Sequence, residues 1–380
     1  MRILIIDSVC GIGSTGRLCK KAADRFTKEG HVVKIAYGRE SYVPDNCRQY
    51  AVRIGNWLDV RWHALMTRLF DFHAFGPVSV RATRKFLSWA EDYDPDFLWL
   101  NSIHGYYINA ELLFDWIKSR PKMRVEWTQH DCWAFTGHCS HFLLANCERW
   151  RVRCEKCPEK HEYPMCIGVS GAKRNWLKKK AAFTGVRNMT LVSPSRWLAN
   201  LVKQSFLNEY DVKVIPNTID GTVFKPVKSN VRDKLGIGRR VMVLGVASEW
   251  DRRKGYNDFL ALRLLLNEQY VLVMVGLKKS QIGELPIGIV GISRTNNATE
   301  LVELYTAADW FFNPTHEDTY PTVNLEARSC GCRIATYDTG GAKETIEGYE
   351  KGYVLSGDCK SPEGFAKLLD QERSPVADII

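Results

Sequence analysis

The sequence lacks any apolar run near 18 residues, the length that a helix needs to cross a bilayer, so it predicts no membrane span. It also lacks internal repeats and low-complexity segments. Its first residues, MRILIIDSV, carry one Arg and a short apolar run before Asp7, which is typical of a buried strand rather than a secretory signal. We therefore expect an ordinary globular protein that stays in the cytoplasm.

Acidic residues are scarce relative to basic ones: the chain has 43 Asp and Glu against 53 Lys and Arg, a formal charge of +10. This surplus favours a negatively charged partner, such as a nucleotide, a nucleic acid or an anionic lipid surface. The length of 380 residues exceeds one ordinary core and predicts two domains of similar size.

Cysteine is not scarce, and six of the 12 cysteines lie between Cys132 and Cys166. Without a secretory signal, this number argues against a disulfide framework. Cys154 and Cys157 form a CxxC knuckle that lets two thiolates face one metal ion. Together with Cys139 and Cys147 they predict a closed, structural zinc site, with reduced thiols and disulfides as the alternatives.

The stretch from Asp309 to Glu344 alternates between strand and helix patterns. WFFNPT is strand-like, TVNLEARSC carries helix formers up to Gly331, and RIATY is a second apolar run before Gly340 and Gly341. This order is typical of a parallel α/β sheet whose functional groups follow the strands' carboxyl ends.

Two carboxylates flank the expected helix start in this stretch. Asp318 precedes the helix and Glu326 lies within it, 326 − 318 = 8 positions later. A helix N-terminus suits phosphate, and ionised carboxylates suit hydroxyl groups. The pattern therefore predicts a sugar-nucleotide site, with a solvated acidic helix start as the alternative.

The same stretch resembles the donor-site signature of family 4 glycosyltransferases, in which seven residues separate two acids and an aromatic–Gly pair follows the first. Tyr320-Pro321 stands at that pair, so Asp318 takes the first acidic position in place of the usual Glu, and Glu317 is the alternative. The resemblance implies the GT-B fold, two Rossmann-like domains facing across a cleft, and a retaining, metal-independent transfer from a nucleotide sugar. It implies catalytic roles for Asp318 and Glu326, and donor binding by Glu317, Tyr320, Pro321, Thr322, Val323 and Gly341.

Two cations follow the expected strand RRVMVLGVAS, where Arg253 and Lys254 precede Gly255 at a helix start. Cations and free N–H groups at one point can neutralise a diphosphate without a metal ion. The pair looks like the Arg and Lys with which the family grips the nucleotide diphosphate. Arg252 competes with Arg253 for that role, and a solvated surface is the plain alternative.

The N-terminal strand is followed by CGIGSTGR, whose Gly11-x-Gly13-x-x-Gly16 is formally the dinucleotide fingerprint. A NAD enzyme needs an acid at the end of the second strand, but Arg39 comes first there. The loop also fits the acceptor side of a two-Rossmann glycosyltransferase, formed here by Gly13, Ser14, Thr15, Gly16 and Arg17.

His130 and Asp131 follow the strand-like VEWTQ, and an imidazole at a strand's carboxyl end can hydrogen-bond a bound sugar. The stretch HDCWAFTGHC looks like a subgroup of family 4 enzymes that build capsular and exopolysaccharide chains. In that subgroup this His sits beside the transferred sugar, which implies a catalytic role for His130; a structural histidine is the alternative.

Residues 56–90 are helical, aromatic and basic in pattern. They predict helices that pack beneath the sheet or, more specifically, a lip that meets a lipid-linked acceptor at a membrane face.

The domain boundaries follow from these motifs. We expect an acceptor domain at 1–215 with a Cys-rich insertion at about 132–166, a donor domain at 216–361, and a helix in 362–380 that crosses back to the first domain. The expected function is transfer from a UDP- or GDP-sugar to a glycan or lipid-linked acceptor in polysaccharide biosynthesis. We expect it in the cytoplasm, with a peripheral contact to an anionic membrane and no nucleic acid. A sugar-nucleotide epimerase of the same fold and a zinc-knuckle nucleic-acid-binding protein are the alternatives.

Overall fold

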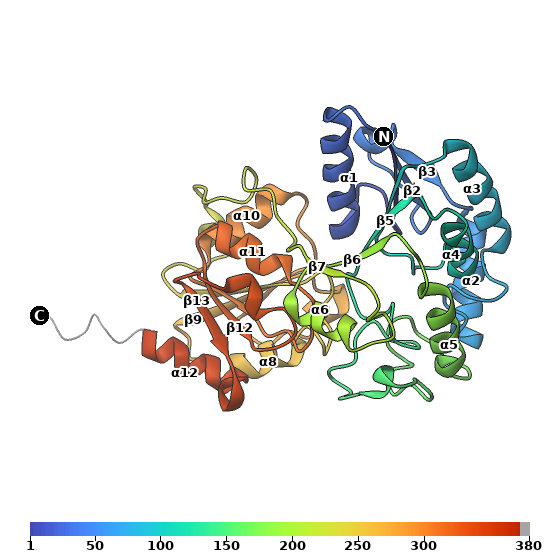
Figure 1. Cartoon of the computed structure of the whole chain (residues 1–380). Coiled ribbons are helices and arrows are strands. Elements are labelled where there is room, and N and C mark those ends of the chain that lie inside the picture. The colour runs from blue at the N-terminus through green and yellow to red at the C-terminus, as the bar shows by residue number, and fades with distance from the viewer. Residues whose placement is uncertain (373–380) are drawn as a thin grey trace, which may run out of the picture. The chain divides into compact units, whose positions relative to one another are not determined.

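The computed structural model describes residues 1–372, and the chain divides into two compact units, Met1–Ile215 and Pro216–Ile380. Each unit is built around one parallel β-sheet with helices on its faces (Figure 1). The two units are described one at a time below.

The first unit contains a seven-stranded sheet in the order β3-β2-β1-β4-β5-β6-β7, and all its strand pairs are parallel. The order reverses between β1 and β4, which makes the carboxyl ends of these strands the topological switch point. The strands are β1 Arg2–Ile6, β2 Val32–Tyr37, β3 Ala51–Arg53, β4 Phe97–Leu100, β5 Arg124–Thr128, β6 Met189–Ser193 and β7 Val212–Val214.

Both faces of this sheet are covered, so its central strands β1 and β4 are nearly continuous apolar runs. Along β1, Leu4 and Ile6 face one apolar cluster while Ile3 and Ile5 face the other. The covering helices are α1 Gly13–Lys28, α2 Trp57–Phe70, α3 Val80–Tyr93, α4 Ala110–Lys118, α5 Ala172–Phe183 and α6 Arg196–Lys203.

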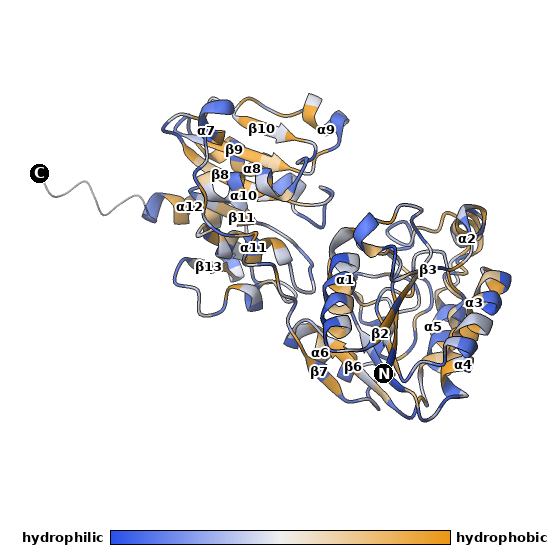
Figure 2. Ribbon diagram, turned by 90° about the horizontal axis from the view of Figure 1, so that it is seen from above, coloured by the Kyte–Doolittle hydropathy of each residue, from blue (hydrophilic) through white to orange (hydrophobic). Residues whose placement is uncertain are grey.

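The second unit contains a six-stranded, all-parallel sheet in the order β10-β9-β8-β11-β12-β13, whose switch point lies between β8 and β11. Its strands are β8 Val241–Val246, β9 Tyr270–Val275, β10 Ile289–Ile292, β11 Trp310–Asn313, β12 Arg333–Tyr337 and β13 Gly352–Leu355. Every residue of β9 is buried, and Figure 2 shows this strand in the orange of apolar residues.

The helices of the second unit are α7 Val231–Lys234, α8 Tyr256–Leu265, α9 Lys279–Gly283, α10 Ala298–Ala307, α11 Thr322–Ser329 and α12 Pro362–Glu372. α12 packs against α8 within this unit, and Phe365 stacks on Phe312 with ring centroids 4.2 Å apart. Of the expected helix in 362–380, the structure thus describes the part up to Glu372; residues 373–380 lie outside the described residues.

The helical pattern of residues 56–90 resolves into α2 and α3, separated by the non-helical residues 71–79. α2 ends because Asp71 adopts a left-handed conformation with φ 56° and turns its side chain into the interior. Among the described residues, no helix combines the length and the apolar character that a bilayer-spanning segment needs.

Candidate functional site

The centre of the second unit's site is an ion pair at the switch point of its sheet. Lys254 lies in the turn after β8, and Asp318 lies in the loop after the neighbouring strand β11. The Lys254 Nζ pairs with the Asp318 Oδ2, and these side chains are only 19% and 15% exposed. The structure therefore brings together Lys254 and Asp318, which lie 64 positions apart in the sequence and were predicted from separate motifs.

The loop that carries Asp318 is braced by the glycine turn after β12. The Asp318 carbonyl accepts a hydrogen bond of 2.9 Å from the Gly341 N–H. Gly340 has φ +53°, and a Cβ there would lie 2.1 Å from the Asp318 carbonyl oxygen, so only glycine fits. The Tyr320 N–H donates to the Asp318 Oδ1 at 3.2 Å and orients the carboxylate.

Arg253 ties the two loops of the site together. Its guanidinium donates a hydrogen bond of 3.0 Å to the Glu317 carbonyl, and its own carbonyl accepts one of 2.8 Å from the His316 N–H. Arg253 is half-buried as a result, whereas Arg252 is exposed. The Glu317 side chain is buried, at 1% exposure.

Glu326 lies on α11, where the hydroxyl of Tyr305 from α10 donates to its Oε2 at 3.0 Å. Tyr305 is fully buried, and burial together with the charge of Glu326 raises the pKa of its hydroxyl. The bond fixes the direction in which the carboxylate points. Sequence reasoning missed Tyr305, although it belongs to the apolar face of a helix that precedes the site.

The remaining donor-site residues open α11. Tyr320 and Pro321 are buried just before the helix, and Thr322 and Val323 form its half-buried first turn. The first N–H groups of a helix lack intrahelical partners, so this end can receive an anion beside the ion pair.

In the first unit the glycine-rich segment is helical, because α1 begins at Gly13. Ser14 and Thr15 therefore lie in the first turn of a helix, and Arg17 directly follows that turn, rather than lying in a loop. Gly16 is buried, and a Cβ there would lie 2.9 Å from the Val9 Cγ2.

Asp7 joins the loops after β1 and β4. Its buried carboxylate accepts hydrogen bonds from the Thr15 hydroxyl and, at 3.2 Å, from the Ser102 N–H. Burial raises the pKa of this carboxyl above its usual range. Through Asp7, the start of α1 is held at the carboxyl ends of β1 and β4.

His130 follows β5, and its Nε2 lies 3.0 Å from the Asn101 Oδ1. Burial lowers the pKa of this imidazole to about 4, so the ring is neutral at physiological pH. Because a neutral imidazole that bonds an amide oxygen must donate, the proton sits on Nε2. Both residues line one small pocket together with Ser102, His104, Gln129 and Asp131.

A second imidazole in this pocket links a carboxylate to a phenol. The His104 Nε2 lies 3.0 Å from the Asp131 Oδ2, and its Nδ1 lies 3.2 Å from the Tyr163 hydroxyl. Burial alone would raise the pKa of Asp131, but its interactions, above all those with His104, bring it below the usual range. The sequence places these partners 27 and 59 positions from His104, which is why their pairing could not be predicted.

The four cysteines of the expected zinc site share one apolar environment. Cys139 and Cys154 belong to the buried cluster of the first unit, and Cys147 and Cys157 pack against it. A hydrogen bond between Cys139 and Cys157 raises the pKa of the former and lowers that of the latter. The Gly137 N–H donates to the Cys154 Sγ at 3.2 Å, but burial raises the pKa of this thiol to about 11.

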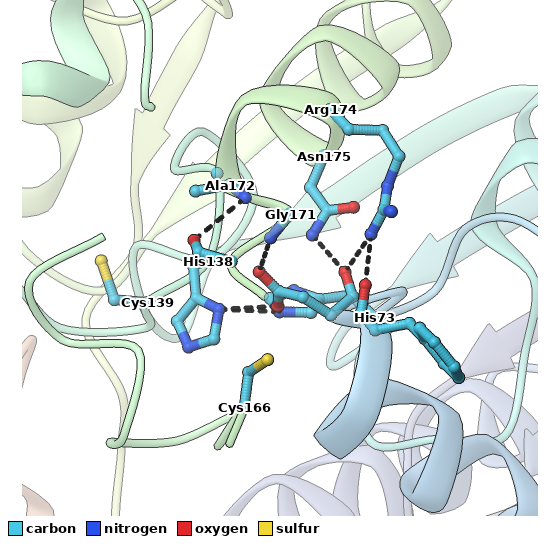
Figure 3. A network of polar contacts seen from close by, with 12 residues as sticks. His73, His138, Cys139, Cys166, Gly171, Ala172, Arg174 and Asn175 are labelled. Atoms are coloured by element: carbon cyan, nitrogen blue, oxygen red, sulfur yellow. Dashed lines mark hydrogen bonds and ion pairs between the residues drawn. The ribbon is translucent and has the colours of Figure 1, made fainter. Parts of the chain in front are cut away.

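Among the described residues, three metal-ligating atoms lie within 4.8 Å of one another at a different place, formed by Asp71, His73 and His138. The Asp71 Oδ1 lies 2.6 Å from the His73 Nε2 and 2.7 Å from the His138 Nδ1. The Gly171 N–H donates to the Asp71 Oδ2 at 2.6 Å. Figure 3 shows His138, Gly171, Arg174 and Asn175 converging on this point.

Hydrogen bonds link the members of this cluster. The Trp133 indole can only donate, and it lies 3.0 Å from the His73 Nδ1, which must accept. Burial lowers the pKa of His73 to about 3, so the ring is neutral and carries its proton on Nε2, the atom that faces Asp71. These hydrogen bonds hold the end of α2, the Cys-rich segment and the start of α5 together.

Comparison with known proteins agrees with this geometry. Residues 227–372 match the family model of glycosyl transferases group 1. A protein of Escherichia coli (strain K12) that carries the name colanic acid biosynthesis glycosyl transferase WcaC is 26% identical over 295 residues. That alignment covers 75% of this chain and 69% of the relative.

Solved structures share the whole architecture. Sucrose-phosphate synthase from Thermosynechococcus elongatus superimposes with a TM-score of 0.70 at 14% identity, over 98% of this chain and 90% of the other. HepE from Anabaena, solved with UDP-glucose, gives a TM-score of 0.62 at 14% identity over 98% and 90%.

The chain therefore has the GT-B fold, with two parallel α/β units, as the resemblance predicted. Its second unit is a glycosyl transferases group 1 domain, and it carries the Lys254–Asp318 pair. The dinucleotide fingerprint at Gly11 to Gly16 lies in the other unit of this fold.

Proposed function

We propose that this enzyme transfers a glycosyl group from a nucleotide sugar to a glycan or lipid-linked acceptor in polysaccharide biosynthesis. In this proposal the transfer retains the anomeric configuration and needs no catalytic metal. The observation that carries the proposal is the half-buried pair of Lys254 with Asp318, because it sets a cation and a hydroxyl-binding acid at one switch point.

Each group of the second unit has a role in this reaction. Lys254 and the N–H groups that open α11 stabilise the negative charge on the departing diphosphate, and Arg253 contributes to the same charge. Asp318 accepts hydrogen bonds from the sugar hydroxyls, and Glu326, oriented by Tyr305, accepts them from the ribose. The proton of the acceptor hydroxyl passes to the leaving phosphate, so no protein base is needed.

The first unit takes the acceptor in this proposal, through the first turn of α1 and the polar pocket after β4 and β5. The catalytic role that the resemblance implies for His130 stays a prediction. Its neutral imidazole suits hydrogen bonding to a sugar hydroxyl.

Two comparisons favour particular substrates. HepE was solved with UDP-glucose, which supports a UDP-sugar over a GDP-sugar as donor. The name of the Escherichia coli relative supports an extracellular polysaccharide as the product. A nucleotide-sugar donor together with a lipid-linked acceptor favours the cytoplasmic face of a membrane as the place of reaction, with a peripheral contact to anionic lipid.

A thermal-shift panel of UDP, GDP, ADP and CMP tests the donor site. We expect UDP to raise the melting temperature, since a ligand at 100 times its Kd stabilises the folded state by about 2.7 kcal/mol. The shift should persist in EDTA, because Lys254 and not a metal ion holds the diphosphate. A shift with NADP or RNA alone would contradict the proposal. If UDP is released from a UDP-sugar without any acceptor, and the epimer of the sugar is formed, the epimerase alternative would be favoured.

We also propose a structural zinc ion held by Cys139, Cys147, Cys154 and Cys157, supported by the shared environment of these thiols and the N–H bond to Cys154. Elemental analysis of the purified chain is expected to give one zinc per molecule, and Cys154→Ser to lose it. Cys359→Ser, at an exposed cysteine of the second unit, should leave the zinc content unchanged. A wild-type chain without zinc would show that the four residues are reduced thiols.

A further inference from the structure

The outward face of α2 is apolar. Six large apolar side chains of this helix are between 39% and 58% exposed: Trp57, Leu58, Trp62, Leu65, Leu69 and Phe70. The spacing of Leu58, Trp62, Leu65 and Leu69, by 4, 3 and 4 positions, puts these four on one stripe of the helix. A helix on the surface of a soluble protein normally turns such a stripe toward the core.

The inward face of the same helix is polar. His63 and Thr67 are fully buried. His63 bonds the Ser79 hydroxyl at 2.7 Å through Nδ1 and the His73 carbonyl through Nε2. Hydrogen bonds from beneath therefore anchor α2 in this orientation, with its apolar stripe outward.

The apolar surface continues past the end of α2. The N–H groups of Ile167 and Gly168 donate to the Arg68 carbonyl at 2.9 and 3.2 Å, so this segment crosses the last turn of the helix. Ile167 and Val169 are 60% and 83% exposed. Two segments about a hundred positions apart thus present apolar side chains next to each other, and contiguous patches of this kind mark interaction sites.

Cations border the stripe. Arg61 and Arg68 are exposed on α2 itself. A surface depression of about 640 Å³ beside Trp62 is lined by Arg81, Arg84 and Lys85 at the start of α3. The acid among its lining residues, Asp59, is engaged with the Asn56 N–H in the cap of α2. The border therefore carries positive charge against which a second copy of the same face would be repelled.

We propose that the outward face of α2, bordered by the basic start of α3, docks on an anionic phospholipid bilayer. Tryptophan and leucine enter the interface between headgroups and acyl chains, while arginine and lysine meet the phosphates. With 14 residues, α2 lies in the plane of the membrane rather than across it. The inference rests on the proposed function and deepens its membrane contact, because it names the surface and the side chains that meet the lipid.

The test is sedimentation of the full chain with vesicles, which involves no glycosyl transfer. Vesicles of phosphatidylcholine alone are compared with vesicles that also contain phosphatidylglycerol. We expect binding to the anionic vesicles only, weakened by added salt. A wild-type chain that does not bind vesicles but still shows the thermal shift with UDP would overturn this inference alone. A wild-type chain without the thermal shift would overturn the proposed function.

Variants separate the two parts of the surface. One variant carries Leu65→Glu and Leu69→Glu, and a second carries Arg81→Gln, Arg84→Gln and Lys85→Gln. We expect each variant to weaken binding to anionic vesicles at least tenfold. For the second variant this follows because each surface cation is worth about a factor of five in binding. Leu264→Glu, at a leucine of α8 that is 84% exposed, is the matched control and should bind as the wild type does.

Circular dichroism is the control for folding. We expect each variant to fold, because all the replaced side chains are solvent-exposed or border solvent. Equal binding by the stripe variants and the control would overturn the proposal. So would equal binding to both kinds of vesicle. A wild-type dimer in solution that Leu65→Glu dissociates would assign the face to a second copy instead.

Discussion

Replacing Lys254 by alanine is expected to lower the rate of glycosyl transfer about 10²- to 10³-fold while the protein stays folded, the loss typical of removing one donor to a developing oxyanion. The side chain is largely buried beside Asp318, so its charge acts in a medium of lower dielectric constant than water. Without this lysine, the leaving diphosphate loses its main cation. The measurement is the release of nucleoside diphosphate from the donor that the thermal-shift panel selects.

Lys367→Ala is the matched control, since this lysine is exposed on α12 and should retain full activity. Asp318→Ala is expected to lose activity to a similar extent. The double variant should be little worse than either single one, because residues that act as one unit are not additive. If Lys254→Ala keeps full activity and still binds the nucleotide, the proposed catalytic site in the second unit is wrong.

Replacing Asp71 by asparagine is expected to destabilise the first unit by about 3 kcal/mol, in the range for breaking a buried charged hydrogen-bond network. The carboxylate accepts bonds on both oxygens, from His73 and His138 on one and from the Gly171 N–H on the other. An asparagine side chain has one oxygen and one NH₂ group. Either orientation therefore sets a donor against a donor in a site from which water is excluded.

The measurement is denaturant unfolding followed by tryptophan fluorescence. Of the 12 tryptophans only Trp250 and Trp310 lie outside the first unit, so the signal reports mainly on that unit. Asp45→Asn is the control, because Asp45 pairs with Arg48 on the surface and should shift stability by less than about 0.5 kcal/mol. An unchanged midpoint for Asp71→Asn would show that the network is not what holds the Cys-rich segment.

The strands and the donor-site loop could be predicted from the sequence, because their signals are local. The expected runs RILII, YVLVMV and RIATY are β1, β9 and β12, since buried parallel strands need unbroken apolar residues. The helix after Pro321 follows from a fixed proline φ and helix formers behind it.

The partners of the site residues could not be predicted in the same way. Lys254 and Asp318 were each marked by their own motif, but the strand order that makes β8 and β11 neighbours brings them into contact. Tyr305 carries no motif, and its bond to Glu326 depends on how α10 packs beside α11. His104 and Asp131 follow different strands, and only the parallel pairing of β4 with β5 joins them.

By itself the sequence determined the class of this protein. Apolar periodicity predicted the parallel α/β architecture that the structure confirms, and the two acids eight positions apart with the cations after β8 predicted a nucleotide-sugar site. The tertiary structure decided which groups pair, that Asp71 with two histidines forms a hydrogen-bonded cluster, and that α2 turns its apolar stripe outward. The physical reason is that strand and helix signals arise from neighbouring residues, whereas pairing and burial depend on contacts between segments far apart in the chain.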